Sequence, residues 1–383
     1  MLISETVKYV GVNDRKTDLF EGQYKIPNGI SYNSYAIIDE KIAIMDSVDV
    51  AYGDEWLSNI ERAIGDRSPD YLVVHHMEPD HSANVVRFLD KYPKALIVSS
   101  QKAFLMMKGY FGTDFEGQRI VVSEGSVIEL GVHSLSFISA PMVHWPEVMV
   151  SYDSFDKILF SADAFGKFGA LDADEVWDDE ARRYYIGIVS KYGVQVQSLL
   201  KKAATLDIEM VCPLHGPVLK DNLSHYFGLY DKWSSYVPEA EGVAIAYTSV
   251  YGNTKRVVTA LCGELKKHGV TVEVYDLARS DMSEAVAAAF KYTKLVLATT
   301  TYNADVFPFM KEFIDHLVER NFKNRKLAMI ENGSWAPMAA KIMRSSLEPC
   351  RDLQFTEASI RINCAPNAET VAEIQSLAAE LAV

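Results

Sequence analysis

The sequence predicts an α/β protein of two domains, in which an N-terminal αββα sandwich precedes a doubly wound parallel sheet. The chain has 383 residues, and one domain usually holds roughly 100–200 residues. Short β-like runs stand close together up to residue 235, and a regular alternation of strand-like and helix-like segments follows. A polar stretch with Pro and Gly, residues 234–242, separates the two patterns. We therefore expect domains at 1–240 and 241–383.

The N-terminal part offers six apolar runs of strand length, with amphipathic segments between some of them. The expected strands cover residues 41–49, 71–76, 95–100, 119–125, 134–141 and 157–165. The expected helices cover residues 54–65 and 85–93. This mixture favours two sheets packed face to face with helices outside, which is αββα layering.

The C-terminal part alternates five strand-like segments with five helix-like segments. The expected strands cover residues 243–247, 270–277, 294–300, 326–332 and 355–362. The expected helices cover residues 253–269, 283–293, 307–321, 337–348 and 368–382. Such an alternation predicts a parallel sheet, and in the order 2-1-3-4-5 the first, third and fourth strands end at one crevice.

Charge and composition exclude several classes of function. The chain carries 38 basic and 52 acidic residues, a net charge of −14, which disfavours nucleic acid and anionic membrane surfaces as partners. No run approaches the ~20 apolar residues of a membrane helix, and the N-terminus lacks the order of a secretory signal. We therefore expect a cytoplasmic protein. The four cysteines form no C-x-x-C pair, so we expect reduced, mostly buried thiols rather than a thiolate metal site.

Histidines and carboxylates gather directly after the expected strand at 71–76. Four candidate metal ligands lie within six positions: His76, Glu78, Asp80 and His81. We expect Pro79 to block a helix here, so that an extended loop points alternate side chains into one pocket. His75 alternates with His76 along the strand and should face away from that pocket.

Three later β-like runs each deliver one further candidate ligand into a loop, namely His144, Asp163 and His215. Four histidines and three carboxylates are more than one tetrahedral ion uses, so two metals that share a carboxylate fit better. Imidazole with carboxylate suits iron, manganese or zinc. Carboxylates stabilise ferric iron and favour redox work, while two zinc ions and hydrolysis remain open. The other histidines, His133, His225, His268 and His316, have no such context.

The run His76-Met77-Glu78-Pro79-Asp80-His81, followed by isolated His, Asp and His, resembles the metallo-β-lactamase superfamily. Glu78 replaces the second His of the hydrolases, which makes the chain similar to the flavodiiron proteins. The segments 31–39 and 140–147 and the PLHGP around His215 are similar as well. The resemblance implies that His76, Glu78 and His144 hold one iron, that Asp80, His81 and His215 hold the other, and that Asp163 bridges them.

Three loops of the C-terminal part suit a phosphate and a planar ring. Hydroxyls, an amide and Gly at the first strand-to-helix turn let backbone N–H groups cradle a phosphate, although a well-capped helix has the same residues. Together the loops resemble those with which flavodoxin binds FMN, with Tyr302 and Trp335 as aromatic faces. A dinucleotide is disfavoured because no G-x-G-x-x-G motif follows the first strand. The candidate FMN residues are Thr248, Ser249, Val250, Tyr251, Gly252, Asn253, Thr254, Thr300, Thr301, Tyr302, Asn303, Asn332, Gly333, Ser334, Trp335 and Ala336.

The resemblance covers essentially the whole chain and implies an oxidoreductase. FMN would take electrons from a separate donor, a rubredoxin-like protein or a reduced soluble cofactor, and pass them to a non-haem diiron centre. That centre would reduce dioxygen to water, nitric oxide to nitrous oxide, or both. The family also implies a head-to-tail homodimer or a dimer of dimers.

Two other functions remain as alternatives. One is a dinuclear zinc hydrolase with a flavodoxin-like accessory domain, which Glu78 disfavours. The other is a flavodoxin-type electron carrier whose N-terminal domain only docks partners. A bundle-type diiron oxidase is disfavoured because the chain lacks paired E-x-x-H helices.

Overall fold

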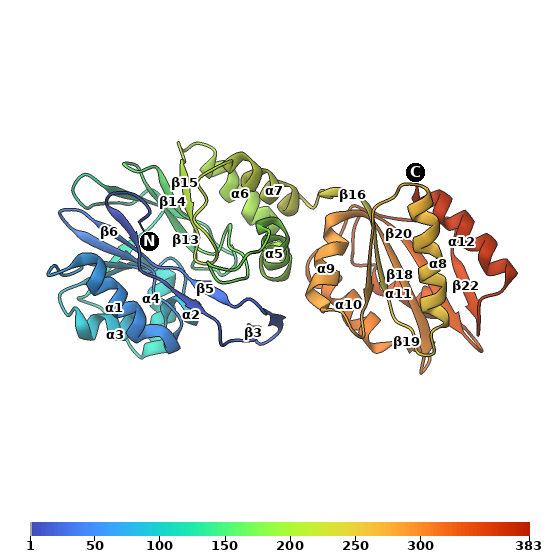
Figure 1. Ribbon diagram of the computed structural model, residues 1–383. Coiled ribbons are helices and arrows are strands. Elements are labelled where there is room, and N and C mark those ends of the chain that lie inside the picture. The colour runs from blue at the N-terminus through green and yellow to red at the C-terminus, as the bar shows by residue number, and fades with distance from the viewer. Residues whose placement is uncertain (1) are drawn as a thin grey trace. The chain divides into compact units, whose positions relative to one another are not determined.

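The structure, a computed structural model, describes residues 2–383. The chain folds into two compact units (Figure 1). The first unit comprises Met1–Tyr185 and Val194–Asp231, and the second comprises Ile186–Gly193 and Lys232–Val383. The domain boundaries at 1–240 and 241–383 stay a prediction.

Two sheets pack face to face in the first unit. The six-stranded sheet has the order β1-β6-β7-β8-β9-β10 and the five-stranded sheet the order β11 to β15. Their bounds are β1 Val7–Tyr9, β6 Tyr35–Ile38, β7 Ile42–Met45, β8 Tyr71–Val73, β9 Leu96–Ser100, β10 Arg119–Val122, β11 Val127–Glu129, β12 Ser134–Ser139, β13 Met149–Asp153, β14 Ile158–Phe160 and β15 Met210–Cys212. Alternate side chains of the two sheets, such as Ile37 and Met45 against Phe137 and Phe160, form one buried core. Face-to-face packing is thus confirmed.

Two short ribbons complete the strands of this unit: β2 (Val12–Asp14) pairs with β5 (Ile30–Tyr32), and β3 (Leu19–Phe20) with β4 (Tyr24–Lys25). The helices are α1 Gly53–Ile64, α2 Pro79–Ser82, α3 Val85–Lys91, α4 Gln101–Phe111, α5 Trp177–Tyr184, α6 Gly193–Ala203 and α7 Leu223–Ser235. α1 buries Trp56, Ile60 and Ile64, and this spacing makes one apolar stripe.

One expectation about this unit is wrong. Pro79 does not block a helix, because it occupies the first position of the one-turn helix α2. Proline is well suited to that position, since its missing N–H has no partner in a helix anyway and its φ is already helical. Asp80 and His81 therefore lie on a helical turn and not on an extended loop.

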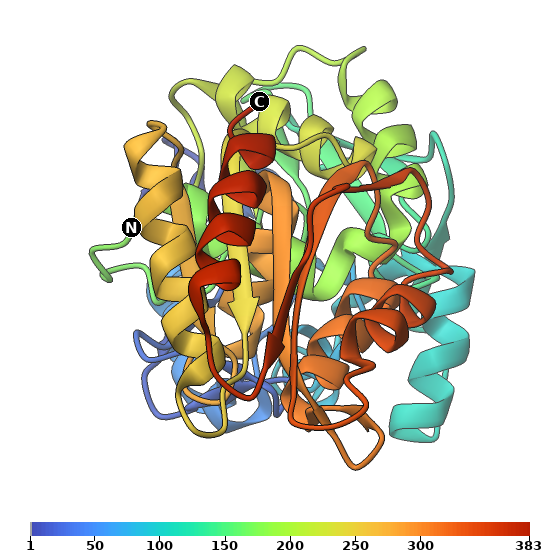
Figure 2. The same ribbon diagram turned by 90° about the vertical axis from the view of Figure 1, so that its right-hand side faces the viewer.

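The second unit is a parallel sheet in the order β17-β16-β18-β20-β21, which confirms the predicted 2-1-3-4-5. Its elements are β16 Ala240–Tyr247, α8 Asn253–Lys267, β17 Val272–Asp276, α9 Met282–Lys291, β18 Tyr292–Tyr302, β19 Asp305–Val306, α10 Pro308–Glu319, β20 Arg325–Gly333, α11 Ala339–Ser346, β21 Leu353–Phe355, β22 Ile360–Asn363 and α12 Ala368–Leu381. Helices α8 and α12 lie side by side on one face of the sheet (Figure 2). They bury Leu261, Leu265, Leu377 and Leu381 against it.

The expected strand at 355–362 is two short strands, β21 and β22, both paired with β20. Between them the Glu380 carboxylate accepts the N–H groups of Glu357 and Ala358. These contacts give the two N–H groups an acceptor where the pairing with β20 is interrupted.

Two other expectations can be compared with the structure. Among the described residues, no helix has the length and apolar character needed to cross a membrane. The thiols are free, but only Cys212 is buried and Cys364 is exposed. The expectation of mostly buried thiols is therefore wrong.

Candidate functional site

The seven candidate ligands come together where strands of both sheets of the first unit end. His76 and Glu78 follow β8, and Asp80 and His81 lie on α2. The other three occupy the β12–β13 loop and the turns after β14 and β15. They form two groups with ligand atoms within 4.8 Å of one another: His76, Glu78, His144 and Asp163, and Asp80, His81 and His215.

The Asp163 carboxylate lies between the two groups. Its Oδ2 is 3.0 Å from Nε2 of His144 and 3.4 Å from Nε2 of His76. Its Oδ1 is 3.3 Å from Nε2 of His81 and 3.7 Å from Nε2 of His215. Each oxygen therefore faces a different group, which is the arrangement of a carboxylate that joins two metal ions.

The cluster is almost entirely shielded from water. Only Glu78 is partly exposed, whereas the other six side chains are buried. Both carboxylate oxygens of Asp80 and Oδ1 of Asp163 are buried without a hydrogen-bond donor among the described residues. Buried carboxylate oxygens are costly unless they are paired or bind a metal. The donor set thus fits cations held between these residues.

Without a metal, protons balance the charges of the site. Burial opposes a charged ring, but hydrogen bonds with Asp163 and Glu78 outweigh it and raise the pKa of His144 to about 9. Burial raises the pKa of Asp80 to about 8. Burial would also raise the pKa of Asp163, yet the charge of His76 holds it well below its usual range. Metal ions would replace these protons, since ligands bind in their deprotonated forms.

Hydrogen bonds and aromatic rings fix the orientation of the histidines. Nδ1 of His215 is 2.7 Å from the carbonyl oxygen of Ser31, so it carries the proton and leaves Nε2 free to bind a metal. The rings of Phe20 and Tyr184 lie 5.4 and 5.5 Å from the His215 ring, and Trp145 lies 5.1 Å from His76. These rings shield the site from water on those sides.

Backbone strain gathers at the same place. Met142, Ala162 and Phe165 have φ values of 65°, 50° and 67°, in the left-handed region that non-glycine residues rarely adopt. Each lies within two residues of His144 or Asp163. Such strain is typical of functional sites, where surrounding contacts hold the backbone in place.

The remaining histidines of the first unit lie outside the cluster. His75 faces Asp46 (2.5 Å) and Ser151 (2.8 Å), as expected. His133 forms a separate group with Asp153 and Asp156 that the sequence did not predict. Its two ring nitrogens are hydrogen-bonded to Asp153 (2.9 Å) and Thr6 (2.8 Å), so this group has the character of a hydrogen-bond network.

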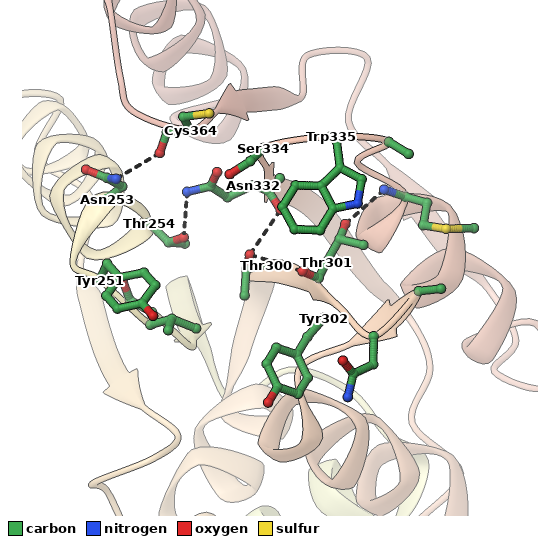
Figure 3. Close-up of a pocket in the computed structure, with 17 residues that line it drawn as sticks. Tyr251, Asn253, Thr254, Thr300, Thr301, Tyr302, Asn332, Ser334, Trp335 and Cys364 are labelled. Carbon is green, nitrogen blue, oxygen red and sulfur yellow. Dashed lines mark hydrogen bonds between the residues drawn. The ribbon is translucent and has the colours of Figure 1, made fainter.

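The second unit has a cavity of about 580 Å³ at the ends of β16, β18 and β20 (Figure 3). All of the predicted FMN residues line it except Thr248 and Gly252. Thr248 is buried beneath it, with Oγ1 2.6 Å from Oγ1 of Thr299. Gly252 precedes α8 with a φ of 89°, a conformation that favours glycine. The cavity is of the size usual for cofactor sites.

The lining of the cavity is polar, aromatic and uncharged. Among the described residues that line it, none has an acidic or basic side chain. Tyr251 and Trp335, 93% and 83% exposed, stand on opposite sides of it (Figure 3). The N-terminus of α8 opens at one end and offers backbone N–H groups to a phosphate. Uncharged loops, exposed aromatic rings and a helix N-terminus fit FMN.

The sequence missed three residues that line the cavity: Ala304, Met338 and Cys364. Cys364 follows β22, and its carbonyl oxygen accepts a hydrogen bond from the Asn253 side chain at 2.8 Å. The predicted strand order could have found it, since the fifth strand of a 2-1-3-4-5 sheet ends beside the fourth.

Comparisons with known proteins match both units. The family described as ODP family beta lactamase matches residues 30–216, and the flavodoxin family matches residues 245–348. An uncharacterised protein of Methanocaldococcus jannaschii, MJ0732, is 30% identical over 82% of this chain and 81% of its own length. The nitric oxide reductase of Moorella thermoacetica is 26% identical over 99% of this chain and 97% of its own.

A solved structure has the same fold over nearly the whole chain. The crystal structure of the flavodiiron protein from Giardia intestinalis superposes with a TM-score of 0.92 at 25% identity. The superposition covers 99% of this chain and 95% of that one. The order of the two units is therefore shared with that protein.

Proposed function

The chain belongs to the flavodiiron proteins, and on that basis we propose which of its residues hold FMN and the two irons. It is an oxidoreductase with FMN and a non-haem diiron centre as its cofactors. When bound, FMN supplies electrons to the irons, and the iron pair binds and reduces a small diatomic molecule.

We assign one iron to His76, Glu78 and His144, the other to Asp80, His81 and His215, and the bridge to Asp163. The observation that carries this assignment is the position of Asp163, whose two oxygens face the Nε2 atoms of different groups. The buried oxygens of Asp80 and Asp163 that have no hydrogen-bond donor among the described residues support it as well.

The loops around the cavity of the second unit would hold FMN. Residues 248–254 would bind the phosphate through backbone N–H groups and hydroxyls, with α8 behind them. Residues 300–303 and 332–336 would border the ring, with Tyr302 and Trp335 as aromatic faces. Because none of the described residues that line the cavity is basic, no side-chain cation among them would offset the charge of a reduced flavin.

The substrate that we propose is dioxygen, nitric oxide, or both. The nitric oxide reductase activity named for the Moorella relative supports the second. Proton delivery and exclusion of bulk water fall to the protein, and the aromatic rings of Phe20, Tyr184 and Trp145 provide the shielding.

We further propose that the protein acts in the cytoplasm as a head-to-tail homodimer or dimer of dimers. Electrons would come from a separate donor, a rubredoxin-like protein or a reduced soluble cofactor. With a net charge of −14, an acidic donor would need a docking patch that is locally less negative.

Turnover of the two gases tests this function. Protein loaded with iron and FMN should consume nitric oxide or dioxygen when a chemical reductant supplies electrons, with nitrous oxide or water as product. The variant Asp163→Asn should lose this turnover by more than about 100-fold. Turnover equal in the variant and the wild type would overturn the assignment.

A further inference from the structure

Glu147 is a buried carboxylate beside the candidate metal site that coordinates nothing in the assignment above. It lies just before β13 and is 3% exposed. Its Oε1 is 2.8 Å from Nδ1 of His76 and accepts a hydrogen bond from the Met77 N–H at 2.9 Å. Its Oε2 is buried without a hydrogen-bond partner among the described residues. The Glu147 side chain thus holds both the His76 ring and the Met77 backbone at the start of the ligand motif.

The contact determines which nitrogen of His76 is free for a metal. Nε2 of His76 points into the cluster, 3.2 Å from Oε2 of Glu78 and 3.4 Å from Oδ2 of Asp163. Nδ1 points outward to Glu147. A carboxylate accepts but does not donate, so Nδ1 keeps its proton toward Glu147. Nε2 faces two carboxylates inside the cluster, so it is Nε2 that gives up its proton when a metal binds and then offers its lone pair.

Other histidines of the cluster have different partners at Nδ1. For His215 the partner is the neutral carbonyl oxygen of Ser31. Nδ1 of His81 is buried with no hydrogen-bond partner among the described residues. A carboxylate on the distal nitrogen makes an imidazole more electron-rich than a carbonyl does. The two metal positions therefore differ in the charge of the groups that contact Nδ1 of their histidine ligands.

We propose that Glu147 is a positioning residue that makes His76 the strongest electron donor among these rings and stabilises the oxidised iron in the position of His76, Glu78 and His144. The proposal rests on the diiron assignment above. The negative charge behind His76 favours ferric over ferrous iron, so this position should have the lower reduction potential of the two.

The variant Glu147→Gln separates this role from a structural one. The amide oxygen can accept the same two hydrogen bonds from His76 and Met77, while the negative charge is removed. The cost is a buried NH₂ group in place of Oε2, which destabilises folding. Asp153→Asn is the matched control, because Asp153 is a fully buried carboxylate on Nδ1 of His133, outside the cluster.

The first readout is the affinity of metal-free protein for Fe(II), measured by competition with a chelator. Loss of the carboxylate behind a metal-binding histidine typically weakens metal binding about 10- to 100-fold, so we expect a loss in this range for Glu147→Gln and none for Asp153→Asn. The second readout is the reduction potential of the iron centre, followed by electron paramagnetic resonance without turnover. We expect a more positive potential, with a changed Mössbauer signal for one iron of the two.

Unchanged affinity and potential in folded Glu147→Gln would overturn the proposal, as would equal changes in Asp153→Asn. If Glu147→Gln does not fold, Glu147→Asp takes its place. The shorter side chain keeps the charge but lengthens the contact with Nδ1, so a smaller positive shift is expected, and an unchanged potential contradicts the proposal. Wild-type protein that binds zinc and no iron would instead overturn the diiron assignment itself.

Discussion

His81 and His215 face each other in the buried cluster with their Nε2 atoms 3.0 Å apart. Both atoms also lie near Oδ2 of Asp80, at 3.3 and 3.4 Å. Burial opposes the charged ring of His81, but Asp80 and Asp163 outweigh it and raise its pKa to about 8. Burial and the charge of His81 lower the pKa of His215 to about 4. Nε2 of His81, Nε2 of His215 and Oδ2 of Asp80 thus converge on one point, and this is the point that we assign to a metal.

Replacement of His215 should remove one iron and leave FMN in place. The variant His215→Asn loses one of the three ligands that this iron does not share, and we expect the iron content to fall from about two to about one per chain. Turnover should fall by more than about 100-fold, because both metals act on one substrate. Iron analysis and flavin absorbance check this. His225→Asn is the control, since His225 is a half-exposed histidine paired with Asp178, and an equal loss of iron there would contradict the assignment.

The affinity for Fe(II) should rise with pH. In the metal-free protein His81 and His144 hold protons up to pH values of about 8 and 9, and Fe(II) must displace them. Each displaced proton changes the affinity about tenfold per pH unit. Chelator competition at pH 6 and pH 8 measures this effect. An affinity that is independent of pH would contradict it.

The metal-free protein should become less stable as the pH rises, because His81 and His144 then lose the protons that stabilise the folded state. The folded-state pKa values of His81 and His144 lie above the ordinary value of about 6.5, so their contribution to stability is complete below that pH. It is lost as the pH rises through about 8 to 9. Thermal unfolding between pH 6 and 9 should show this decline in metal-free protein but not in iron-loaded protein. A decline of equal size in both would contradict the explanation.

Thr301 should stabilise the loop beside the flavin ring. Its Oγ1 accepts the N–H groups of Met338 and Ala339 at 2.9 and 3.1 Å, at the start of α11. Loss of such a cap costs about 1 kcal/mol, so Thr301→Val should weaken FMN binding about fivefold and leave the iron content unchanged. Fluorescence titration with FMN measures the change in affinity. Thr259→Val, on the exposed side of α8, is the control and should bind FMN as the wild type does.

The predicted boundary at residue 241 can be tested with fragments. Buried Arg325 donates to the carbonyl oxygens of Tyr236 at 2.8 Å and of Phe290. A fragment that begins at 241 loses the Tyr236 acceptor, while the same guanidinium nitrogen keeps the carbonyl oxygens of Lys323 and Asn324 at 3.0 and 3.2 Å. The loss is therefore that of one hydrogen bond, which contributes about 0.5–1.5 kcal/mol. Residues 232–383 should therefore unfold at higher denaturant than residues 241–383, and both should bind FMN. Equal stability would show that the boundary at 241 is adequate.

Much of this architecture was predictable because its signals are local. Apolar runs that end in His or Asp mark the positions of His76, Asp163 and His215. The alternation after residue 243 indicates a parallel sheet, and the resemblance to flavodoxin adds the order 2-1-3-4-5. Other features depend on contacts distant in sequence. Glu147 contacts His76 from 71 positions away in the sequence. Glu380, on the last helix, accepts the N–H of Glu357 between the two short strands. Pro79 was misjudged because the same residue that breaks a helix interior also begins a helix well.

The metal content of protein produced with ample iron and purified without air distinguishes a diiron oxidoreductase from a zinc hydrolase. We expect about two irons and about one FMN per chain, with an exchange-coupled iron pair in the Mössbauer spectrum. Predominantly zinc, persisting after iron supplementation, would contradict it and would favour a dinuclear zinc hydrolase.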